Sequence, residues 1–295
     1  MQRATETIRE LLRRAENHLT SHGVPNARRN AEWMLCASLG VSMLDLYVRS
    51  RESLGSAAVA EYWNRIERRA SREPLQYILG STEFMALPFF ARPGVFVPRP
   101  DTEVLVEHAE KKLRALPLHE PALVLDLCCG SGVIGVSIAK HVPNAGVTAV
   151  DSSDAAVELT AENAAHNGVA DRVRLVHDDA ADYLERTTDR FAAILCNPPY
   201  IPSGELAGLP REVREHEPML GLDGGPDGLD FYRRAIPPMV RCLLPNGFVM
   251  VEIGDAQGPA VSELLRAAGF GDIRVIPDLA GRDRVVGGVH DGLSR

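Results

Sequence analysis

The fold is decided by residues 122–135, ALVLDLCCGSGVIG, where an apolar run leads into a glycine-rich loop and then into a second apolar pattern. The run 122–127 has the length of a buried strand, and 133–141 has a helical pattern. Gly130 and Gly132 would let the backbone approach a ligand closely, where the strand's carboxyl end meets the helix N-terminus. The stretch therefore predicts a strand, a ligand-binding loop and a helix.

The segments around this stretch alternate between strand and helix patterns. Apolar runs predict strands at 122–127, 146–151, 172–177, 191–196 and 247–253. Helical patterns fall at 101–116, 133–141, 153–167, 228–243 and 257–268. This alternation is typical of an open, mostly parallel α/β sheet. Two further segments, 271–277 and 283–290, are expected to supply an antiparallel edge.

The chain is predicted to contain more than one domain. Residues 1–74 predict a small all-helical domain that stabilises the protein or docks a substrate, because apolar residues recur there at helical spacing. Residues 75–100 alternate short β-like runs with prolines and glycines, which predicts a β-hairpin connector. The α/β domain then takes 101–295.

The composition excludes several classes of protein. The 295 residues contain no apolar stretch approaching the ~18 residues of a membrane span, so a cytoplasmic protein without membrane contact is expected. Five cysteines without a C-x-x-C pair argue against a disulfide framework and against a structural metal site. A net charge of −8 argues against direct nucleic-acid binding.

The glycine loop by itself leaves the cofactor open. Residues 130–135, GSGVIG, match the dinucleotide fingerprint, and Asp151 after the second strand could bind the ribose of NAD or of S-adenosylmethionine. The loop lacks the lysine of a triphosphate site. Negative charge from Asp126 and Asp179 favours a sulfonium cation over a pyrophosphate, although both carboxylates could instead serve turns or helix caps.

A second motif leaves the fourth strand at its carboxyl end. The apolar run 191–196 passes directly into Asn197-Pro198-Pro199-Tyr200. Prolines end a strand, but they do not require the asparagine or the tyrosine. A planar –NH2 group could donate to the Asn197 side-chain oxygen and to the Pro198 carbonyl while the Tyr200 ring packs against it. The motif predicts a clamp for a planar nitrogen at the edge that carries the glycine loop.

Asn197–Tyr200 after a glycine loop and Asp151 resembles the S-adenosylmethionine-dependent methyltransferases that modify adenine or glutamine nitrogens. The stretches REPLQYILG, FVPRPDTEVLVEHA, EHEPMLGLDGGPDGLDFYRR and DLAGRDRVV narrow the resemblance to the release factor glutamine methyltransferases, the HemK family, over essentially the full length. The resemblance implies a Rossmann-like methyltransferase domain that methylates the glutamine amide in the Gly-Gly-Gln motif of peptide chain release factors.

The resemblance, together with the charge argument for Asp126, predicts roles for individual residues. Cofactor contacts are expected from Asp126, Cys128, Cys129, Gly130, Ser131, Gly132, Asp151, Asp179, Ala180 and Asn197. Contacts with the glutamine are expected from Phe96, Asn197, Pro198, Pro199 and Tyr200, of which Asn197, Pro198 and Tyr200 would be catalytic. The family usually has Gly-Thr where this chain has Cys128-Cys129, which removes any contact from the threonine hydroxyl.

Catalysis is expected to rest on positioning of the amide nitrogen without a general base, since the proton can leave after methyl transfer. Other functions stay open at this point. A ribosomal-protein glutamine methyltransferase or a nucleic-acid adenine methyltransferase would share the clamp. An NAD-dependent oxidoreductase would share the glycine loop, and a non-enzymatic module could bind a release factor without consuming cofactor.

Overall fold

The computed structural model describes residues 6–116 and 122–292. The chain folds into two compact units. The first contains Met1–Gly80 together with Pro210–His216, and the second contains Ser81–Leu209 and Glu217–Arg295. The helical unit is thus assembled from two separate stretches of the sequence.

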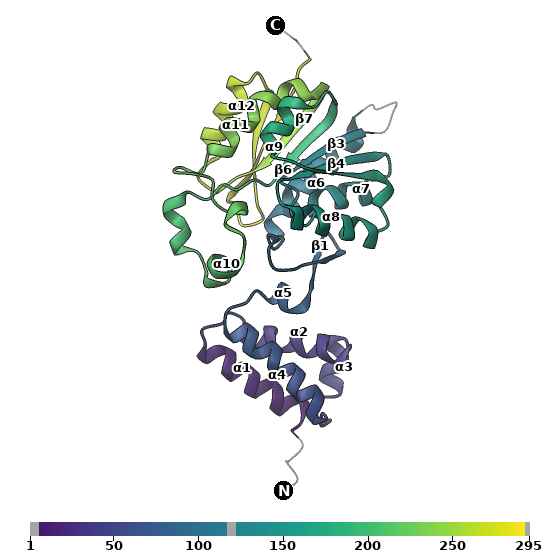
Figure 1. Ribbon diagram of the computed structural model, residues 1–295, viewed down its shortest axis with the longest axis vertical. Coiled ribbons are helices and arrows are strands. Elements are labelled where there is room, and N and C mark those ends of the chain that lie inside the picture. Colours follow the sequence, from purple (N-terminus) through teal and green to yellow (C-terminus); the bar gives the residue numbers. More distant parts are fainter. Residues whose placement is uncertain (1–5, 117–121, 293–295) are drawn as a thin grey trace. The chain divides into compact units, whose positions relative to one another are not determined.

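The helical unit packs amphipathic helices around a core of its own (Figure 1). Thr7 and Glu10 form a reciprocal capping box that begins the first helix. Gly40, in the left-handed conformation, ends the second helix. The bounds are α1 Ile8–Ser21, α2 Ala27–Leu39, α3 Met43–Val48, α4 Ser56–Ala70, α5 Leu75–Leu79 and α10 Arg211–His216.

Buried charges attach α10 to the rest of the helical unit. Arg69 and Arg72 contact the Glu212 carboxylate at 2.8 and 2.6 Å, one on each oxygen. Arg69, which is 4% exposed, also donates through Nε to Asn30 Oδ1 at 2.8 Å. The half-buried Glu212 carboxylate thus compensates the charge of the buried Arg69 and of the half-buried Arg72, whereas its loss would leave the Arg69 charge without a carboxylate partner.

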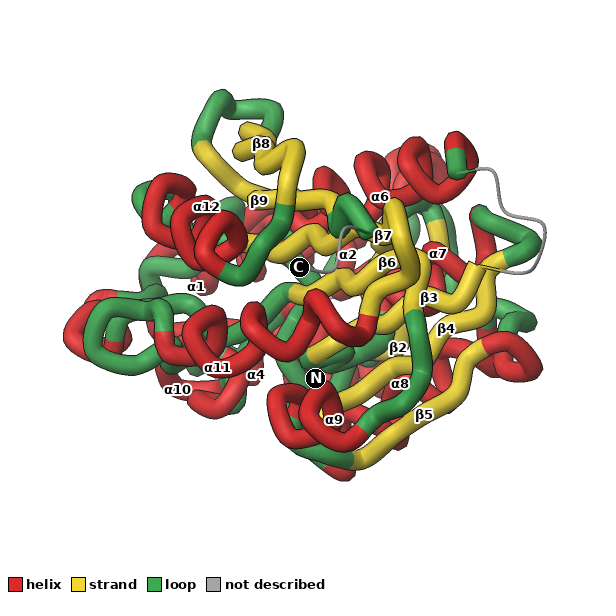
Figure 2. Tube along the Cα trace, turned by 90° about the horizontal axis from the view of Figure 1, so that it is seen from above, coloured by secondary structure: helices red, strands yellow, loops and turns green. Residues whose placement is uncertain are grey.

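The second unit is a mostly parallel sheet with helices on both faces. Seven strands of its described residues follow the order β5-β4-β3-β6-β7-β9-β8 (Figure 2). The strands are β3 Ala122–Leu127, β4 Ala145–Asp151, β5 Val173–His177, β6 Phe191–Cys196, β7 Leu243–Glu252, β8 Gly271–Pro277 and β9 Asp283–Val289. Pairing is parallel from β5 to β7, and β9 pairs antiparallel with both β7 and β8, so the predicted antiparallel edge is confirmed.

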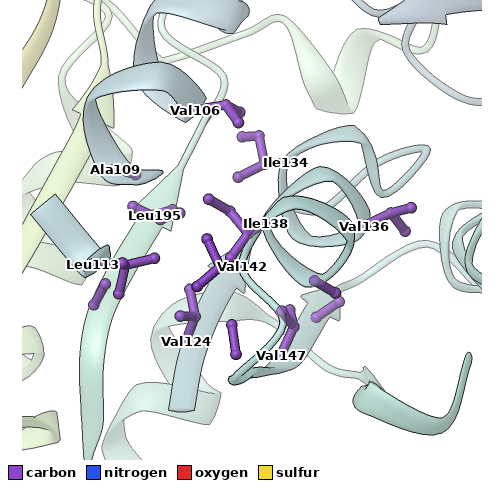
Figure 3. Close-up of a cluster of buried hydrophobic side chains, with 14 of the residues drawn as sticks. Val106, Ala109, Leu113, Val124, Ile134, Val136, Ile138, Val142, Val147 and Leu195 are labelled. Atoms are coloured by element: carbon purple, nitrogen blue, oxygen red, sulfur yellow. The ribbon is translucent and has the colours of Figure 1, made fainter. Parts of the chain in front are cut away.

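Each face of the sheet buries an apolar layer, because successive strand residues point to opposite sides. One layer, which includes Val106, Val124 and Ile134, packs beneath α6, α7 and α8 (Figure 3). The other includes Leu125 and packs beneath α9, α11 and α12. The helices are α6 Glu103–Ala115, α7 Val133–His141, α8 Asp154–His166, α9 Ala180–Arg186, α11 Asp230–Met239 and α12 Gly258–Ala267.

A short hairpin, β1 Ser81–Phe84 and β2 Leu87–Phe90, precedes this sheet and forms part of the predicted connector. Phe84 and Phe89 pack edge to face with their ring centres 6.2 Å apart. The Asn163 side chain on α8 accepts from the Phe90 N–H and donates to its carbonyl. The hairpin is thereby attached to the α/β unit.

No helix within the described ranges is long and apolar enough to cross a membrane. The predicted strands and the long helices of the α/β unit are confirmed to within a few residues at their ends. The sequence pattern did not predict α9, whose seven residues span only about two helical turns and offer little periodicity.

Replacing Glu212 by alanine should destabilise the helical unit, because the buried Arg69 and the half-buried Arg72 then lose their carboxylate partner. We expect a loss of ~3 kcal/mol in the free energy of unfolding, the usual size for breaking a buried ion pair. Urea denaturation followed by circular dichroism measures this. Glu215→Ala is the matched control on the same helix, since its exposed pairs with Arg211 and Arg214 should leave the midpoint unchanged. Equal midpoints for both variants would contradict the role assigned to Glu212.

Candidate active site

The glycine loop connects β3 to α7 through left-handed backbone conformations. Cys128, Gly130 and Gly132 have φ values of 56°, 57° and 80°. A Cβ atom at Gly132 would lie 2.7 Å from Cγ2 of Thr160, so both its conformation and its contact require glycine. Cys128 takes the same conformation with a side chain, at a position where the resemblance expects glycine.

Asp126 is fully buried below this loop. Its Oδ2 accepts the Gly135 N–H at 2.8 Å, and its Oδ1 has no hydrogen-bond partner among the described residues. Burial raises the pKa of this carboxyl to about 7, against the opposing hydrogen bond from Gly135. Asp126 is not among the residues that line the cavity described below. Asp126 on β3 instead holds the helix that contains Gly135, and it does not face the cavity in which the cofactor was expected.

Asp151, at the end of β4, faces the cavity. Its two oxygens accept the N–H groups of Gly130 and Ser153, each at 2.9 Å. Burial raises the pKa of Asp151, while these backbone hydrogen bonds oppose the rise. A carboxylate has about four lone-pair positions, so each oxygen can accept one more hydrogen bond, as from a ribose hydroxyl.

The cavity of the α/β unit has a volume of about 450 Å³ and lies over the carboxyl ends of β3, β4 and β6. This is where open α/β sheets bind ligands. Of the residues expected at the site, the lining contains Phe96, Cys128, Cys129, Gly130, Ser131, Asp151, Asp179, Ala180, Asn197 and Pro199. The predicted cofactor loop and the predicted clamp therefore share one cavity.

Gly132, Pro198 and Tyr200 stand beside the lining and are not part of it. The Tyr200 hydroxyl donates to Glu252 Oε1 at 3.3 Å. Burial raises the pKa of Tyr200, so the phenol stays protonated. The Asn197 side chain lines the cavity and donates through Nδ2 to the Thr102 hydroxyl at 3.1 Å.

Two expected site residues lie at the start of α9. Asp179 caps this helix by accepting the N–H groups of Ala181 and Asp182, and it also pairs with Arg234 at 3.1 Å. It therefore performs the capping role that the sequence left open while also lining the cavity. Ala180, the next residue, adds an apolar wall.

The glycine-rich stretch after the clamp forms a further wall. Ile201 N–H donates to the Leu222 carbonyl at 3.0 Å, and Gly224 N–H donates to the Ile201 carbonyl at 2.9 Å. A Cβ atom at Gly224 would lie 2.8 Å from the Tyr200 Cα, and one at Gly228 would lie closer still to the Tyr200 carbonyl oxygen. These glycines allow the stretch to lie against the backbone of the clamp.

Several residues of this cavity were not predicted from the sequence. Thr102, Arg99, Phe231 and Arg234 line it, and Glu252 lies behind it. The Arg99 guanidinium lies 2.5 Å from Glu217 Oε1, and its central carbon lies 4.6 Å from the centre of the Phe96 ring. The stretch PRPDTE, which contains Arg99 and Thr102, contributed only to the family resemblance. Its polar residues beside two prolines were the local signal that could have indicated a site.

The stability of an Asp126→Asn variant relative to wild type should increase as pH rises. The carboxyl of Asp126 binds its proton more tightly in the folded than in the unfolded protein. The stability gained from this is complete below the pKa of the unfolded state and is lost as pH increases through about 7, the pKa in the folded state. Asparagine keeps the acceptor for Gly135 and cannot ionise. One pKa unit is worth ~1.4 kcal/mol, so between pH 5 and pH 8 the variant should gain ~2–4 °C or more in melting temperature over wild type.

Thermal melts at several pH values measure this difference, with the exposed Asp255→Asn as control. A difference between Asp126→Asn and wild type that does not change with pH would contradict an ionisation of Asp126 near neutrality.

Family models and solved structures similar to this chain agree with the two-unit fold. The PrmC N-terminal domain model matches residues 10–80, and the methyltransferase small domain model matches residues 86–207. Among solved structures, the Thermus thermophilus 16S rRNA N2 G1207 methyltransferase, in complex with AdoMet and guanosine, is similar with a TM-score of 0.51. It is 20% identical, and the match covers 71% of this chain and 49% of that chain. This likeness shows the fold.

Curated relatives extend over nearly the whole chain. The release factor glutamine methyltransferase of Geobacter sulfurreducens is 44% identical over 96% of this chain and 96% of its own length. Those of Moorella thermoacetica and Caulobacter vibrioides are 43% and 38% identical over 94% and 95% of this chain, and over 96% and 95% of their own lengths. With its methyltransferase fold and helical N-terminal domain, the chain belongs to the release factor glutamine methyltransferase family.

Proposed function

We propose that this protein transfers a methyl group from S-adenosylmethionine to the side-chain amide nitrogen of the glutamine in the Gly-Gly-Gln motif of peptide chain release factors. One observation carries the proposal. Asn197 and Pro199 of the clamp line the same cavity as Gly130 and Asp151 of the predicted cofactor site. A planar amide and a methyl donor would thus meet in one enclosure.

The residues present fit S-adenosylmethionine. The carboxylate of Asp151 has lone pairs for the ribose hydroxyls, and the side-chain position of Gly130 is open space where a ligand could approach the backbone. We assign the loop from Cys128 to Gly132 to the amino acid part of the cofactor, and Asp179 with Ala180 to the adenine. When bound, the cofactor supplies an electrophilic methyl group on a sulfonium.

The clamp residues act on the substrate amide. In the proposed arrangement Asn197 Oδ1 and the Pro198 carbonyl each accept one hydrogen of the –NH2 group, while the Tyr200 ring and Phe96 pack against its plane. An amide nitrogen is a poor nucleophile because its lone pair is delocalised. Holding it in line can supply ~7–11 kcal/mol in favourable cases.

The hydrogen bonds to Asn197 and Pro198 matter most as positive charge develops on the nitrogen, because only stronger binding of the transition state accelerates the step. The methylated nitrogen is acidic and can release its proton to water afterwards. We therefore assign no side chain the role of general base. This agrees with the Tyr200 phenol, whose raised pKa keeps it protonated, so that it cannot take up the proton of the substrate.

We further propose that the helical domain, residues 1–74, docks the protein substrate, that 75–100 connects the domains and that 101–295 carries out the transfer. Exposed apolar side chains on α2 and α3 support the docking role. They are Trp33, Leu44, Tyr47 and Val48, exposed by 45%, 73%, 53% and 78%.

The acidic net charge of −8 supports a protein partner over direct binding of nucleic acid. The proposed substrate class supports a reaction in the cytoplasm, where release factors act.

Mass spectrometry of a release factor incubated with this protein and S-adenosylmethionine tests the proposal. We expect one added methyl group, localised to the glutamine of Gly-Gly-Gln, and none on a factor whose glutamine is replaced by alanine. Methylation of neither factor, with cofactor binding demonstrated by calorimetry, would overturn the proposed substrate. Ribosomal proteins and adenine-containing nucleic acids would then be assayed in the same way.

Asn197→Ala should lower kcat by ~10²-fold or more, the cost of removing one acceptor that stabilises developing charge. The dissociation constant for S-adenosylmethionine should change by less than a few-fold, since Asp151 and the glycine loop remain. Single-turnover assays and calorimetry give the two quantities. Equal losses in turnover and in cofactor affinity would contradict the role proposed for Asn197.

A further inference from the structure

The Asn197 side chain can serve the substrate amide in only one of its two orientations. If Oδ1 faces the cavity, it accepts from the substrate –NH2 group. If Nδ2 faces the cavity, two donor groups oppose each other. The protein must therefore determine which end of this nearly symmetric amide points toward the substrate.

A line of polar groups runs from Asn197 through Thr102, which itself lines the cavity, to Glu252 behind it. Asn197 Nδ2 donates to the Thr102 hydroxyl at 3.1 Å. Thr102 is 2% exposed and lies beside Glu252, close enough to favour the ionised form of its carboxyl. Glu252 ends β7, next to the strand that leads into Asn197, and is 1% exposed.

We propose that the ionised Glu252 carboxylate, acting through Thr102, fixes the orientation of the Asn197 amide and is a positioning residue for methyl transfer. An ionised carboxylate can only accept, so the single Thr102 proton is directed to Glu252. The Thr102 oxygen is then left to accept, and the group of Asn197 that faces it must be –NH2. Oδ1 consequently faces the cavity. The inference rests on the proposed function for its catalytic meaning.

The surroundings of Glu252 support this role. Its Oε1 accepts from the Tyr200 hydroxyl at 3.3 Å, while its Oε2 is buried without a hydrogen-bond partner within the described chain. Oε2 is therefore the acceptor available to the Thr102 proton. Through Oε1 the same carboxylate fixes the Tyr200 ring. One buried group thus connects the two clamp side chains from behind.

The charged groups around Glu252 have other partners. Arg284 on β9 favours the ionised carboxylate but contacts Asp101 and Asp278, each at 3.4 Å. Asp101 disfavours ionisation, and Tyr232 on α11 donates only to the Glu252 main-chain carbonyl, at 2.6 Å. Burial dominates and raises the pKa of Glu252 to about 7.

Protonation would reverse the line of hydrogen bonds. A neutral Glu252 can donate to Thr102, whose proton then turns to Asn197 and favours the orientation with Oδ1 away from the cavity. Turnover should therefore fall as pH decreases through about 7. For a single ionisation at that value, the active fraction drops ~10-fold between pH 8 and pH 6.

The kinetic test compares pH profiles of kcat for wild type and four variants. Glu252→Gln and Thr102→Val should lower kcat at pH 8 about tenfold and flatten the profile between pH 6 and pH 8, with cofactor affinity unchanged within about twofold. Thr102→Ser keeps the hydroxyl and should retain the wild-type profile. Glu110→Gln removes another buried carboxylate, paired with His141 and Arg114, and should also retain it.

The double variant Thr102→Val with Glu252→Gln should lose no more of kcat than either single variant, because both residues act through the same line of polar groups to Asn197. Additive losses, or a wild-type profile in Glu252→Gln, would overturn the inference. Melting temperatures identify any variant that fails to fold. If Glu252→Gln does not fold, the pH profiles of kcat for Thr102→Val and Thr102→Ser are compared instead.

A second readout needs no substrate. The ¹⁵N side-chain signal of Asn197, assigned by its absence in Asn197→Ala, should titrate with a midpoint near the Glu252 pKa of about 7. It should not titrate in Glu252→Gln or Thr102→Val. If the Asn197 signal of the wild type does not change with pH, Glu252 does not control the Asn197 orientation, even if methyl transfer is observed. A titrating signal without methylation of release factor would instead overturn the proposed function and leave the orientation control standing.

Discussion

The hydrogen bond from the Gly135 N–H to Asp126 is the contact on which the site depends. It brings α7 against the central strand so closely that a Cβ atom at Gly135 would lie 2.9 Å from both Asp126 and Val147. The loop before it takes left-handed backbone conformations at Cys128, Gly130 and Gly132, and the Gly130 N–H donates to Asp151. The cost is a carboxyl group in the core, whose pKa rises to about 7.

The site combines two walls with different physical demands. The wall after β3 and β4 presents the backbone of the glycine loop and the Asp151 carboxylate, and in the proposed cofactor site few contacts depend on the side chains of Cys128 and Cys129. The wall after β6 depends on the direction of individual hydrogen bonds from Asn197 and Tyr200. Their partners are Thr102, which also lines the cavity, and Glu252, which lies behind it.

The sequence was sufficient to predict elements whose signal is local. Strand 122–127, the glycine loop and the clamp at Asn197 each carry their own pattern, and parallel strands necessarily bring their carboxyl ends together. Burial was not predictable in the same way. Asp126 was expected near the ligand and lies in the core, while Glu252 looked like an ordinary strand end. Their environments arise from neighbouring strands distant in sequence, which no window of residues contains.

The attachment of α10 to the helical unit limits how this protein could have been assembled. Because Glu212 belongs to that unit while the residues on either side belong to the other, the chain enters the helical unit, leaves it after Gly80, and returns to it at Pro210. A single genetic fusion could append α1–α5 to a methyltransferase, but it would not supply the acidic partner for Arg69 and Arg72. Exchange of the helical domain between relatives would therefore have to include residues 210–216 to keep this ion pair.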